Sequence, residues 1–332
     1  MYLVYFWIMK NIAVVVGGFS AEKLISLKSG KVVLNFLDKD KYNVFTVIID
    51  NEGWRLEKNG KSYPIEKSNF SVEIDNQIIK FDGVFMAIHG TPGENGVLQH
   101  YLDNLEIPYT CSGVKASALS FDKGACNEFL RNFDILCAKS IKLKKGDTID
   151  SSNIIKQLKL PCFVKPNGNG SSFGISKVKS IKELIPAINK AFMHDEYILI
   201  ESLLIGTEVT CGVHNLNGSI ETFPITEIVS ENDFFDFEAK YEGKSKEITP
   251  ARISDDLAKK VSERTIEIYQ LLELNGIARV DFIIMNNEPY IIEANTVPGL
   301  SEESIIPQQA RCHGISLSEL LNQSIELMFH EK

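Results

Sequence analysis

Acidic side chains interrupt two apolar runs near the end of the chain, VDFIIM and PYIIEA, which flank the turn-prone tetrapeptide NNEP. Runs of β-branched and aromatic residues bounded by turn residues predict a β-hairpin. Side chains alternate between the two faces of a strand. A three-residue loop at 286–288 therefore places Asp281 opposite Glu293. The same register places Arg279 opposite Asn295.

The facing carboxylates favour a bound cation, because like charges directly opposite each other destabilise a sheet. Asp281, Glu293 and Asn295 offer the oxygen ligands that Mg2+ takes together with substrate phosphate. A hairpin whose acids simply face solvent is the alternative. The acids lie inside apolar runs and a Pro-Gly turn follows them, so the sequence favours the metal site.

Composition is typical of a globular protein of two or three domains, with 332 residues, 44% of them hydrophobic and 24% charged. The net charge is -9 and basic residues do not cluster, so nucleic acid is not an expected partner. Six scattered cysteines without a Cys-x-x-Cys pair fit free thiols in a reducing cytoplasm. The apolar start, MYLVYFWI, is too short to span a bilayer and lacks a basic signal region, so we expect no membrane partner and a fold that begins after Met9.

The segment from Lys10 to Ala118 alternates predicted strands and helices, which indicates a parallel sheet with ligands at the carboxyl ends of its strands. Two of those ends are polar and rich in glycine: GGFSAE, where Ser20 is the predicted helix cap, and HGTPGENG, which begins at His89. The Gly-x-Gly-x-x-Gly pattern is absent, which argues against a nicotinamide site, while an anion at the helix N-terminus stays open. A single histidine such as His89 is more often structural than catalytic.

A second region begins near Leu119 with a predicted helix capped by Ser120. The run CFVKPNGNGSSFGISKV then predicts two strands joined by a glycine-serine loop. The loop is not a P-loop, but its backbone N–H groups suit a phosphate, and Lys165 on the preceding strand would neutralise its charge. A hairpin loop that binds nothing is an equal alternative at this point.

The predicted strands EYILIES and TEVTCGV carry Glu201 and Glu208 on either side of an apolar link. A flat apolar slot edged by hydrogen-bonding groups suits an adenosine, and ordinary edge-strand acids are the alternative. The later run DFFDFEAKYEGKSKEITPA is long enough to be a functional loop. A helix capped by Ser254 follows it, and a last helix near 317–329 closes the chain.

The combination of motifs resembles the ATP-grasp D-alanine–D-alanine ligases over nearly the whole chain from Met9. The matching motifs are GGFSAE, AIHGTPGENG, YTCSGVKASALSFDK, FVKPNGNGSSFGISKV, LIESLLIGTEVT, DFEAKY, RVDF and IIEANTVPGL. The resemblance implies a parallel-sheet α/β domain at 1–118, followed by a two-domain ATP-grasp fold of α+β type. Its central domain, with the phosphate-covering loop, is expected at 119–212, and its C-terminal domain, with the Mg2+ hairpin, at 213–332.

The resemblance also implies roles for individual residues. Those expected to bind ATP are Lys123, Lys165, Ser171, Ser172, Glu201, Leu204 and Glu208. Those expected to bind the two D-alanines are Glu22, His89, Arg279, Gly299, Ser304 and Ile305. Those expected to take part in catalysis are Glu22, Ser171, Tyr241, Arg279 and Gly299. Those expected to bind two Mg2+ or Mn2+ ions are Asp281, Glu293 and Asn295. The chain departs from the family at Leu24 and at 301–303, next to the second-substrate pocket.

The activity implied is ATP-dependent joining of two D-alanines through a D-alanyl phosphate, for peptidoglycan synthesis in a bacterial cytoplasm, by a homodimer. A related ligase that makes a D-Ala–D-Ser product or a D-Ala–D-lactate depsipeptide would share every ATP motif. A non-catalytic ATP-binding module is the other alternative. It would not need Glu22, Arg279 and a complete metal set together.

Overall fold

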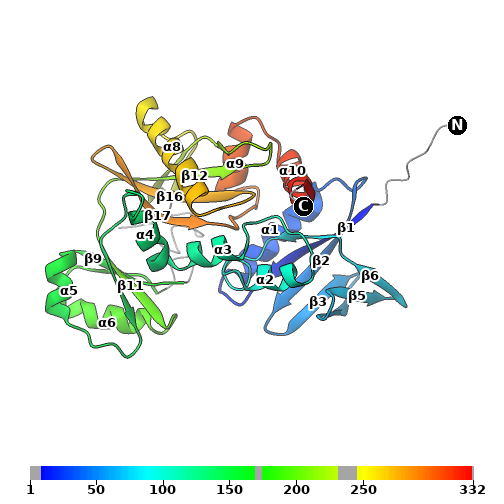
Figure 1. Cartoon of the computed structure of the whole chain (residues 1–332), viewed down its shortest axis with the longest axis horizontal. Coiled ribbons are helices and arrows are strands. Elements are labelled where there is room, and N and C mark those ends of the chain that lie inside the picture. The colour runs from blue at the N-terminus through cyan, green and yellow to red at the C-terminus, as the bar shows by residue number, and fades with distance from the viewer. Residues whose placement is uncertain (1–8, 169–173, 231–244, 331–332) are drawn as a thin grey trace.

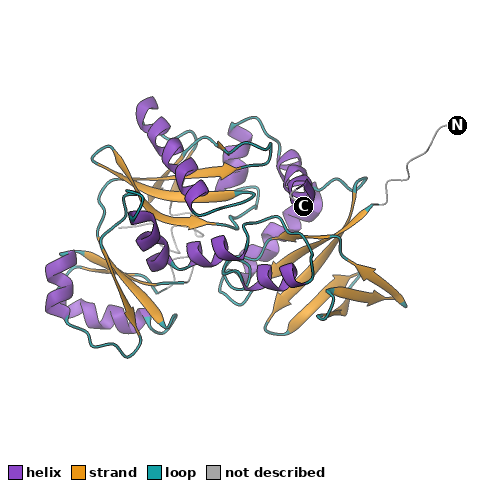
Figure 2. Ribbon diagram, in the orientation of Figure 1, coloured by secondary structure: helices purple, strands orange, loops and turns teal. Residues whose placement is uncertain are grey.

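The computed structural model describes residues 9–168, 174–230 and 245–330. In that part of the chain, three β-sheets lie side by side with helices around and between them (Figure 1 and Figure 2). The predicted α/β and α+β organisation is therefore confirmed. None of the helices described is long and apolar enough to cross a bilayer.

The first sheet has seven strands in the order β6-β5-β4-β3-β2-β1-β7. The predicted parallel arrangement holds for β2, β1 and β7, and the sheet continues beyond β2 as an antiparallel meander. Two-residue turns with positive φ, at Asn59-Gly60 and Asp75-Asn76, close hairpins in this meander. The strand bounds are β1 (Lys10–Gly17), β2 (Tyr42–Asp50), β3 (Gly53–Lys58), β4 (Lys61–Glu66), β5 (Ser71–Ile74), β6 (Gln77–Lys80) and β7 (Gly83–Met86).

Helices from both ends of the chain cover this sheet. They are α1 (Lys23–Phe36), α2 (Val97–Asn104), α9 (Ile305–Cys312) and α10 (Leu317–His330), whereas α3 (Val114–Phe121) packs in the core of the third sheet. Strand β1 is buried on both faces: Ile12 and Val14 pack in one cluster with α1, α9 and α10, whereas Ala13 packs in another with α2. The last helix, red in Figure 1, thus returns to the first sheet and completes its core.

The second and third sheets follow along the chain. The second has the antiparallel order β10-β9-β11-β8 and is backed by two helices. The third has the order β15-β14-β12-β16-β17, with β13 paired to β12. The bounds are α4 (Lys123–Arg131), β8 (Ser140–Lys144), α5 (Ser151–Leu158), β9 (Cys162–Pro166), β10 (Ser176–Val178), α6 (Ile181–Ala191), β11 (Tyr197–Ser202), β12 (Thr207–His214), β13 (Glu221–Thr222), β14 (Thr226–Ser230), β15 (Ser245–Ile248), α8 (Asp255–Leu271), β16 (Ala278–Met285) and β17 (Glu288–Asn295).

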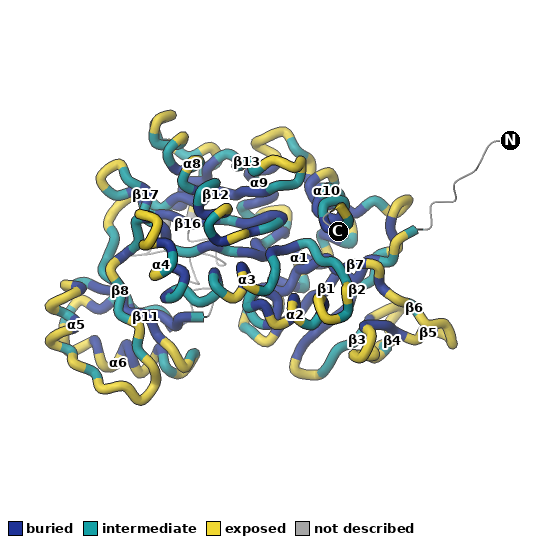
Figure 3. The backbone as a smooth tube through the Cα atoms, in the orientation of Figure 1, coloured by how far each residue is buried: buried dark blue, intermediate teal, exposed yellow. Residues whose placement is uncertain are grey.

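The third sheet is apolar on one face and polar on the other. Val280 and Phe282 of β16 are fully buried in a cluster with α4 and α8. Arg279 and Asp281 alternate with them and therefore point to the opposite face. Figure 3 shows that β12 and β16 are largely buried, and on the polar face Thr210 and Asp281 are buried while Glu208 and Arg279 are partly exposed.

The helix caps differ from two of the sequence predictions. Ser254 caps α8 as predicted and accepts a hydrogen bond from the N–H of Leu257. Ser20 does not cap α1: its hydroxyl donates to the carbonyl of His89, across the sheet edge. Ser120 lies inside α3, and the helix that begins at Lys123 is capped by the next acidic residue, Asp122. Ser20 also accepts from the N–H of Glu22, directly before α1, and Ser120 donates to carbonyl oxygens within α3.

Candidate active site

The hairpin of β16 and β17 has the predicted register but not the predicted turn. Its turn has two residues, Asn286 and Asn287, both with positive φ, so Met285 pairs with Glu288. The three-residue loop was therefore wrong. A bulge in the pairing next to Asp281 adds the missing residue and restores the expected register.

The bulge also decides which face each side chain of β17 occupies. Ile291 and Ala294 are three positions apart, yet both pack in the apolar cluster. Without the extra residue between them, alternation would put Ala294 on the opposite face from Ile291. Glu293 is consequently paired with Asp281, and Asn295 with Arg279, on the polar face.

Protein cations neutralise the two facing carboxylates. Arg279 donates two hydrogen bonds of 2.8 Å to Asp281, one to each carboxylate oxygen. Thr210 and Asn295 also donate to Asp281. The Nζ of Lys123, at the start of α4, lies 3.2 Å from Glu293. The repulsion expected between Asp281 and Glu293 is therefore compensated inside the protein.

A cleft borders this cluster. It is lined by Glu94, Ser120, Phe121, Lys123, Glu293, Ala294, Asn295 and Thr296. Burial alone would lower the pKa of Lys123, but the Glu293 carboxylate raises it above its ordinary value. Lys123 is therefore charged at neutral pH, and the cleft holds a fixed cation beside two oxygen-bearing side chains.

Glu94 belongs to this cleft, and the sequence analysis did not identify it. Its carboxylate accepts a 2.7 Å hydrogen bond from the N–H of Gly90. Burial, followed by the nearby Glu22, raises the pKa of Glu94 to about 8. The polar glycine-rich strand end HGTPGENG was the available indication, and Glu22, Glu94 and His89 converge there.

The second sheet supplies a buried ion pair. Lys165 of β9 lies 2.6 Å from a carboxylate oxygen of Glu201 on β11. The other oxygen of Glu201 accepts from Asn127 of α4, a residue that sequence reasoning missed. Both oxygens of Glu201 are thus bonded within the protein, so this carboxylate holds Lys165 in place.

The other residues predicted for ATP lie close to this pair along the chain. Leu204 is half-buried in the link between β11 and β12. Glu208 of β12 shares a face with Thr210, which pairs with Asp281, so it lies on the polar face of the third sheet. Ser171, Ser172 and Tyr241 lie outside the residues that the structure describes.

Gly299 and Ser304 come together at the start of α9. Ser304 occupies the cap position of this helix, and Ile305 is its first residue. A Cβ atom at Gly299 would stand 3.0 Å from the hydroxyl of Ser304. The hydroxyls of Ser304 and Ser301 are 2.6 Å apart. The predicted donor N–H of Gly299 and the predicted second-substrate residues therefore form one group.

His89 joins the first sheet to this group. Its Nδ1–H donates a hydrogen bond of 2.9 Å to the carbonyl oxygen of Val297. Nε2 is left as an acceptor and lies 3.1 Å from the hydroxyl of Ser29. The N–H of Leu300 also donates to Ser29, so the segment that carries Gly299 is tied to α1 and His89. This arrangement needs a neutral imidazole.

Burial lowers the pKa of His89 from its ordinary 6.5. Below pH 6.5 the His89 imidazole is protonated in the unfolded chain but stays neutral in the folded protein. The free energy of unfolding therefore falls as pH decreases. We expect His89→Gln to flatten this dependence, so that the difference in melting temperature between wild type and variant narrows as pH falls from 7.5 to 5.5. Thermal unfolding at both pH values measures it. A gap that widens on acidification would contradict a neutral His89.

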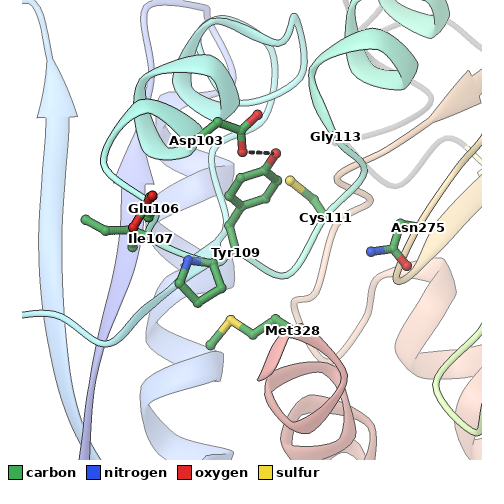
Figure 4. A pocket seen from close by; sticks show the side chains of 9 residues that line it. Asp103, Glu106, Ile107, Tyr109, Cys111, Gly113, Asn275 and Met328 are labelled. Carbon is green, nitrogen blue, oxygen red and sulfur yellow. Dashed lines mark hydrogen bonds between the residues drawn. The ribbon is translucent and has the colours of Figure 1, made fainter. Parts of the chain in front are cut away.

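A second cavity lies away from this cleft. It has a volume of about 640 Å3 and is lined by Asp103, Glu106, Ile107, Pro108, Tyr109, Cys111, Gly113, Asn275 and Met328 (Figure 4). The hydroxyl of Tyr109 donates to Asp103 at its rim. Its lining includes none of the predicted site residues.

Two family models match the chain, one described as the D-ala D-ala ligase N-terminus over residues 11–112 and the other as its C-terminus over residues 129–326. The chain belongs to the D-alanine–D-alanine ligase family. The D-alanine–D-alanine ligase of Flavobacterium johnsoniae is 53% identical over 320 residues, which are 96% of this chain and 99% of that protein. The two family models cover every predicted site residue except Lys123, which lies between them.

Solved structures of the family share the fold. The VanG D-Ala:D-Ser ligase of Enterococcus faecalis has a TM-score of 0.87 at 31% identity, covering 96% of this chain and 99% of that one. The D-alanine–D-alanine ligase of Bacillus anthracis in complex with ATP has a TM-score of 0.78 at 27% identity, covering 97% of this chain and 99% of that one. The family therefore includes enzymes for two different acceptor amino acids on one fold.

Proposed function

We propose that this protein is an ATP-dependent ligase that joins two D-alanines into D-alanyl-D-alanine for peptidoglycan synthesis. The observation that carries the proposal is the convergence of three parts of the fold. Arg279 and Glu293 of the third sheet, Lys123 of α4, and Glu94 beside His89 at the edge of the first sheet face one another. Such a site offers a positive field next to a carboxylate-rich pocket for an ammonium group.

The reaction proposed has two steps. An oxygen of the first D-alanine carboxylate attacks the terminal phosphorus of ATP, which gives D-alanyl phosphate and ADP. The amine of the second D-alanine then attacks the carbonyl carbon, loses a proton, and inorganic phosphate leaves. No protein nucleophile is required, so catalysis consists of positioning and charge stabilisation.

The residues around the two D-alanines have separate roles in these steps. Glu22 and His89 face the first D-alanine, with Glu22 taking its ammonium group. Arg279 and the N–H of Gly299 stabilise the negative charge that develops on the acyl oxygen and the phosphoryl group. Ser304, with Ile305 at the N-terminus of α9, receives the carboxylate of the second D-alanine. This is an anion at a helix N-terminus, an arrangement that the helix dipole favours.

ATP occupies the space between the second and third sheets in this proposal. Lys123 and Lys165 contact its phosphates, and the loop with Ser171 and Ser172 covers them. The backbone after Glu201, with Leu204, contacts the adenine, and Glu208 the ribose hydroxyls. We also propose that Ser171, Tyr241 and Glu22 form one hydrogen-bonded link around the first D-alanine.

Two Mg2+ or Mn2+ ions would be held by Asp281, Glu293 and Asn295, whose oxygens share one face of the hairpin. Within the described ranges no group of three or more His, Cys, Asp and Glu is placed to hold an ion, so oxygens of ATP would complete the coordination. When bound, the ions neutralise charge on the phosphates. Glu293 would exchange its contact with Lys123 for the metal, which frees Lys123 for phosphate.

The acceptor amino acid separates the candidate reactions. With ATP, Mg2+ and D-alanine alone, we expect release of one ADP for each D-alanyl-D-alanine formed. We expect D-serine or D-lactate, offered with D-alanine, to be incorporated much less than D-alanine. The assay compares ADP release with the products separated by chromatography. A product that contains mainly D-serine or D-lactate would assign the chain to the other branch, and ATP binding without ADP release would indicate a binding module.

A homodimer in the cytoplasm is part of the same proposal. The cytoplasmic location is supported by the free cysteines, five of them wholly or partly buried, and by the match to a family with an ATP-bound member; the homodimer is carried over from the resemblance. Burial raises the pKa of the Cys111 and Cys211 thiols to about 12, so they remain protonated and unreactive at neutral pH.

A further inference from the structure

A turn of four residues, 301–304, precedes α9 and carries Ser304. Its sequence is Ser-Glu-Glu-Ser. The backbone N–H of Ser304 donates to the carbonyl of Ser301, which closes the turn at 2.8 Å. The position of Ser304 therefore depends on what holds this turn.

Two side chains from α9 reach back to the turn. Arg311 donates to the carbonyl of Glu302 at 2.8 Å. The Nε2 of Gln308 donates to the carbonyl of Glu303 at 2.6 Å, directly before Ser304. The backbone N–H of Gln308 also donates to the carbonyl of Ser304. The turn is thus held by side chains of the helix that it introduces.

Gln308 makes a second contact that leads back to the sheet. The same Nε2 donates to a carboxylate oxygen of Glu247 at 2.6 Å. An amide nitrogen has two hydrogens, so this group is fully used by Glu247 and Glu303. Glu303 lies five residues before Gln308, whereas Glu247 lies 61 residues before it.

Glu247 stands on the polar face of the third sheet. On β15 it pairs with Ile228, which alternates with Thr226 on β14. Thr226 pairs with Thr210, and Thr210 pairs with Asp281, so all of them share one face. Burial raises the pKa of Glu247, which agrees with a position inside the molecule.

The helix α9 itself is fixed independently of Gln308. The neighbouring Gln309 is fully buried, accepts from the N–H of Gly212 and donates to the carbonyl of Thr210. A Cβ at Gly212 would collide with Gln309, so the close approach of helix and sheet depends on this glycine. Loss of the Gln308 contacts would therefore leave the helix in place and loosen the turn next to Ser304, although Arg311 would still hold Glu302.

We propose that Gln308, braced by Glu247, is a positioning residue that fixes the turn carrying Ser304 and so sets the affinity for the accepting D-alanine. The proposal rests on the proposed function, in which Ser304 receives the carboxylate of the second substrate. Gln308 itself touches neither substrate in this account. Its effect is confined to the second half of the reaction.

Hydroxylamine separates the two halves, because it attacks D-alanyl phosphate from solution and gives a hydroxamate without using the acceptor site. In Gln308→Leu we expect the KM for the accepting D-alanine to rise about five- to tenfold, the value of one or two lost hydrogen bonds. The rate of hydroxamate formation and the KM for ATP should stay within about twofold of wild type. The same substitution at the exposed Gln270 on α8 is the matched control and should change neither quantity.

Variants of Glu247 test the brace. Glu247→Gln keeps an oxygen acceptor for Gln308 and should retain the wild-type acceptor KM, whereas Glu247→Ala should resemble Gln308→Leu. The double variant Glu247→Ala with Gln308→Leu should raise the acceptor KM little beyond either single variant, since both changes remove the same Gln308–Glu247 hydrogen bond. An unchanged acceptor KM in Gln308→Leu, or an equal loss of hydroxamate formation, would overturn the proposal. Wild type that forms neither hydroxamate nor dipeptide would instead refute the proposed function.

Discussion

Replacing Glu293 by Gln is expected to reduce turnover on the order of 100-fold or more, while the protein stays folded. The amide has the shape of the carboxylate but lacks the charge that the proposed metal site and Lys123 both use. Lys123 then stands in the cleft without its nearest anion, at 3.2 Å in wild type, and metal affinity falls. Steady-state rates over a range of Mg2+ concentrations measure the effect.

Glu288→Gln is the matched control for this variant. It makes the same chemical change on the same strand, β17, at a residue that pairs with Lys260 on the surface. We expect near-normal turnover, because surface ion pairs contribute little. Wild-type rates for Glu293→Gln at low Mg2+ would remove Glu293 from the metal site.

Replacing Arg279 by Gln is expected to cost on the order of 100- to 1000-fold in kcat, the loss typical of removing a preorganised group that stabilises transition-state charge. Arg279 is held by two hydrogen bonds to Asp281, so its guanidinium is oriented before substrates bind. The KM for ATP should change much less than kcat. Rapid-quench measurement of D-alanyl phosphate formation reports the chemical step directly.

Arg252→Gln provides the control for lost packing and charge. Arg252 forms a two-point pair with Glu227 on the same sheet, at 2.8 Å for each bond, but outside the proposed site. Arg252 is exposed, so Arg252→Gln should cost less thermal stability than Arg279→Gln and should leave turnover unchanged. Equal losses of turnover in the two variants would show that Arg279 acts through folding.

The sequence was sufficient for the parts of the site that depend on local pattern. Alternation along β16 and β17 put Asp281, Glu293 and Asn295 on one face, and the motifs identified the family. The register came out right although the turn was wrong by one residue, because the unforeseen bulge compensated for it. The bulge allows Ile291 and Ala294 to be buried in the same apolar cluster. This requirement comes from tertiary packing and cannot be predicted from the local sequence.

The residues that sequence reasoning missed belong to contacts between distant segments. Asn127 meets Glu201 from 74 positions away, and Gln308 meets Glu247 from 61. Each of these side chains lies on a helix or strand whose local sequence gives no sign of a special role. The role is visible only once the fold brings the distant partner into contact. The hairpin turn at Asn59-Gly60 is the opposite case, because an Asn-Gly pair is by itself a strong local signal for a two-residue hairpin turn.

The most direct test of the central claim follows the oxygen atoms of the substrate. With D-alanine labelled by 18O in its carboxylate, ATP and Mg2+, formation of an acyl phosphate transfers one labelled oxygen from each donating D-alanine to inorganic phosphate. We predict one 18O in phosphate for each D-alanyl-D-alanine formed, measured by mass spectrometry of both products. Dipeptide formation with unlabelled phosphate would contradict the D-alanyl phosphate pathway, and labelled phosphate without dipeptide would contradict the ligation.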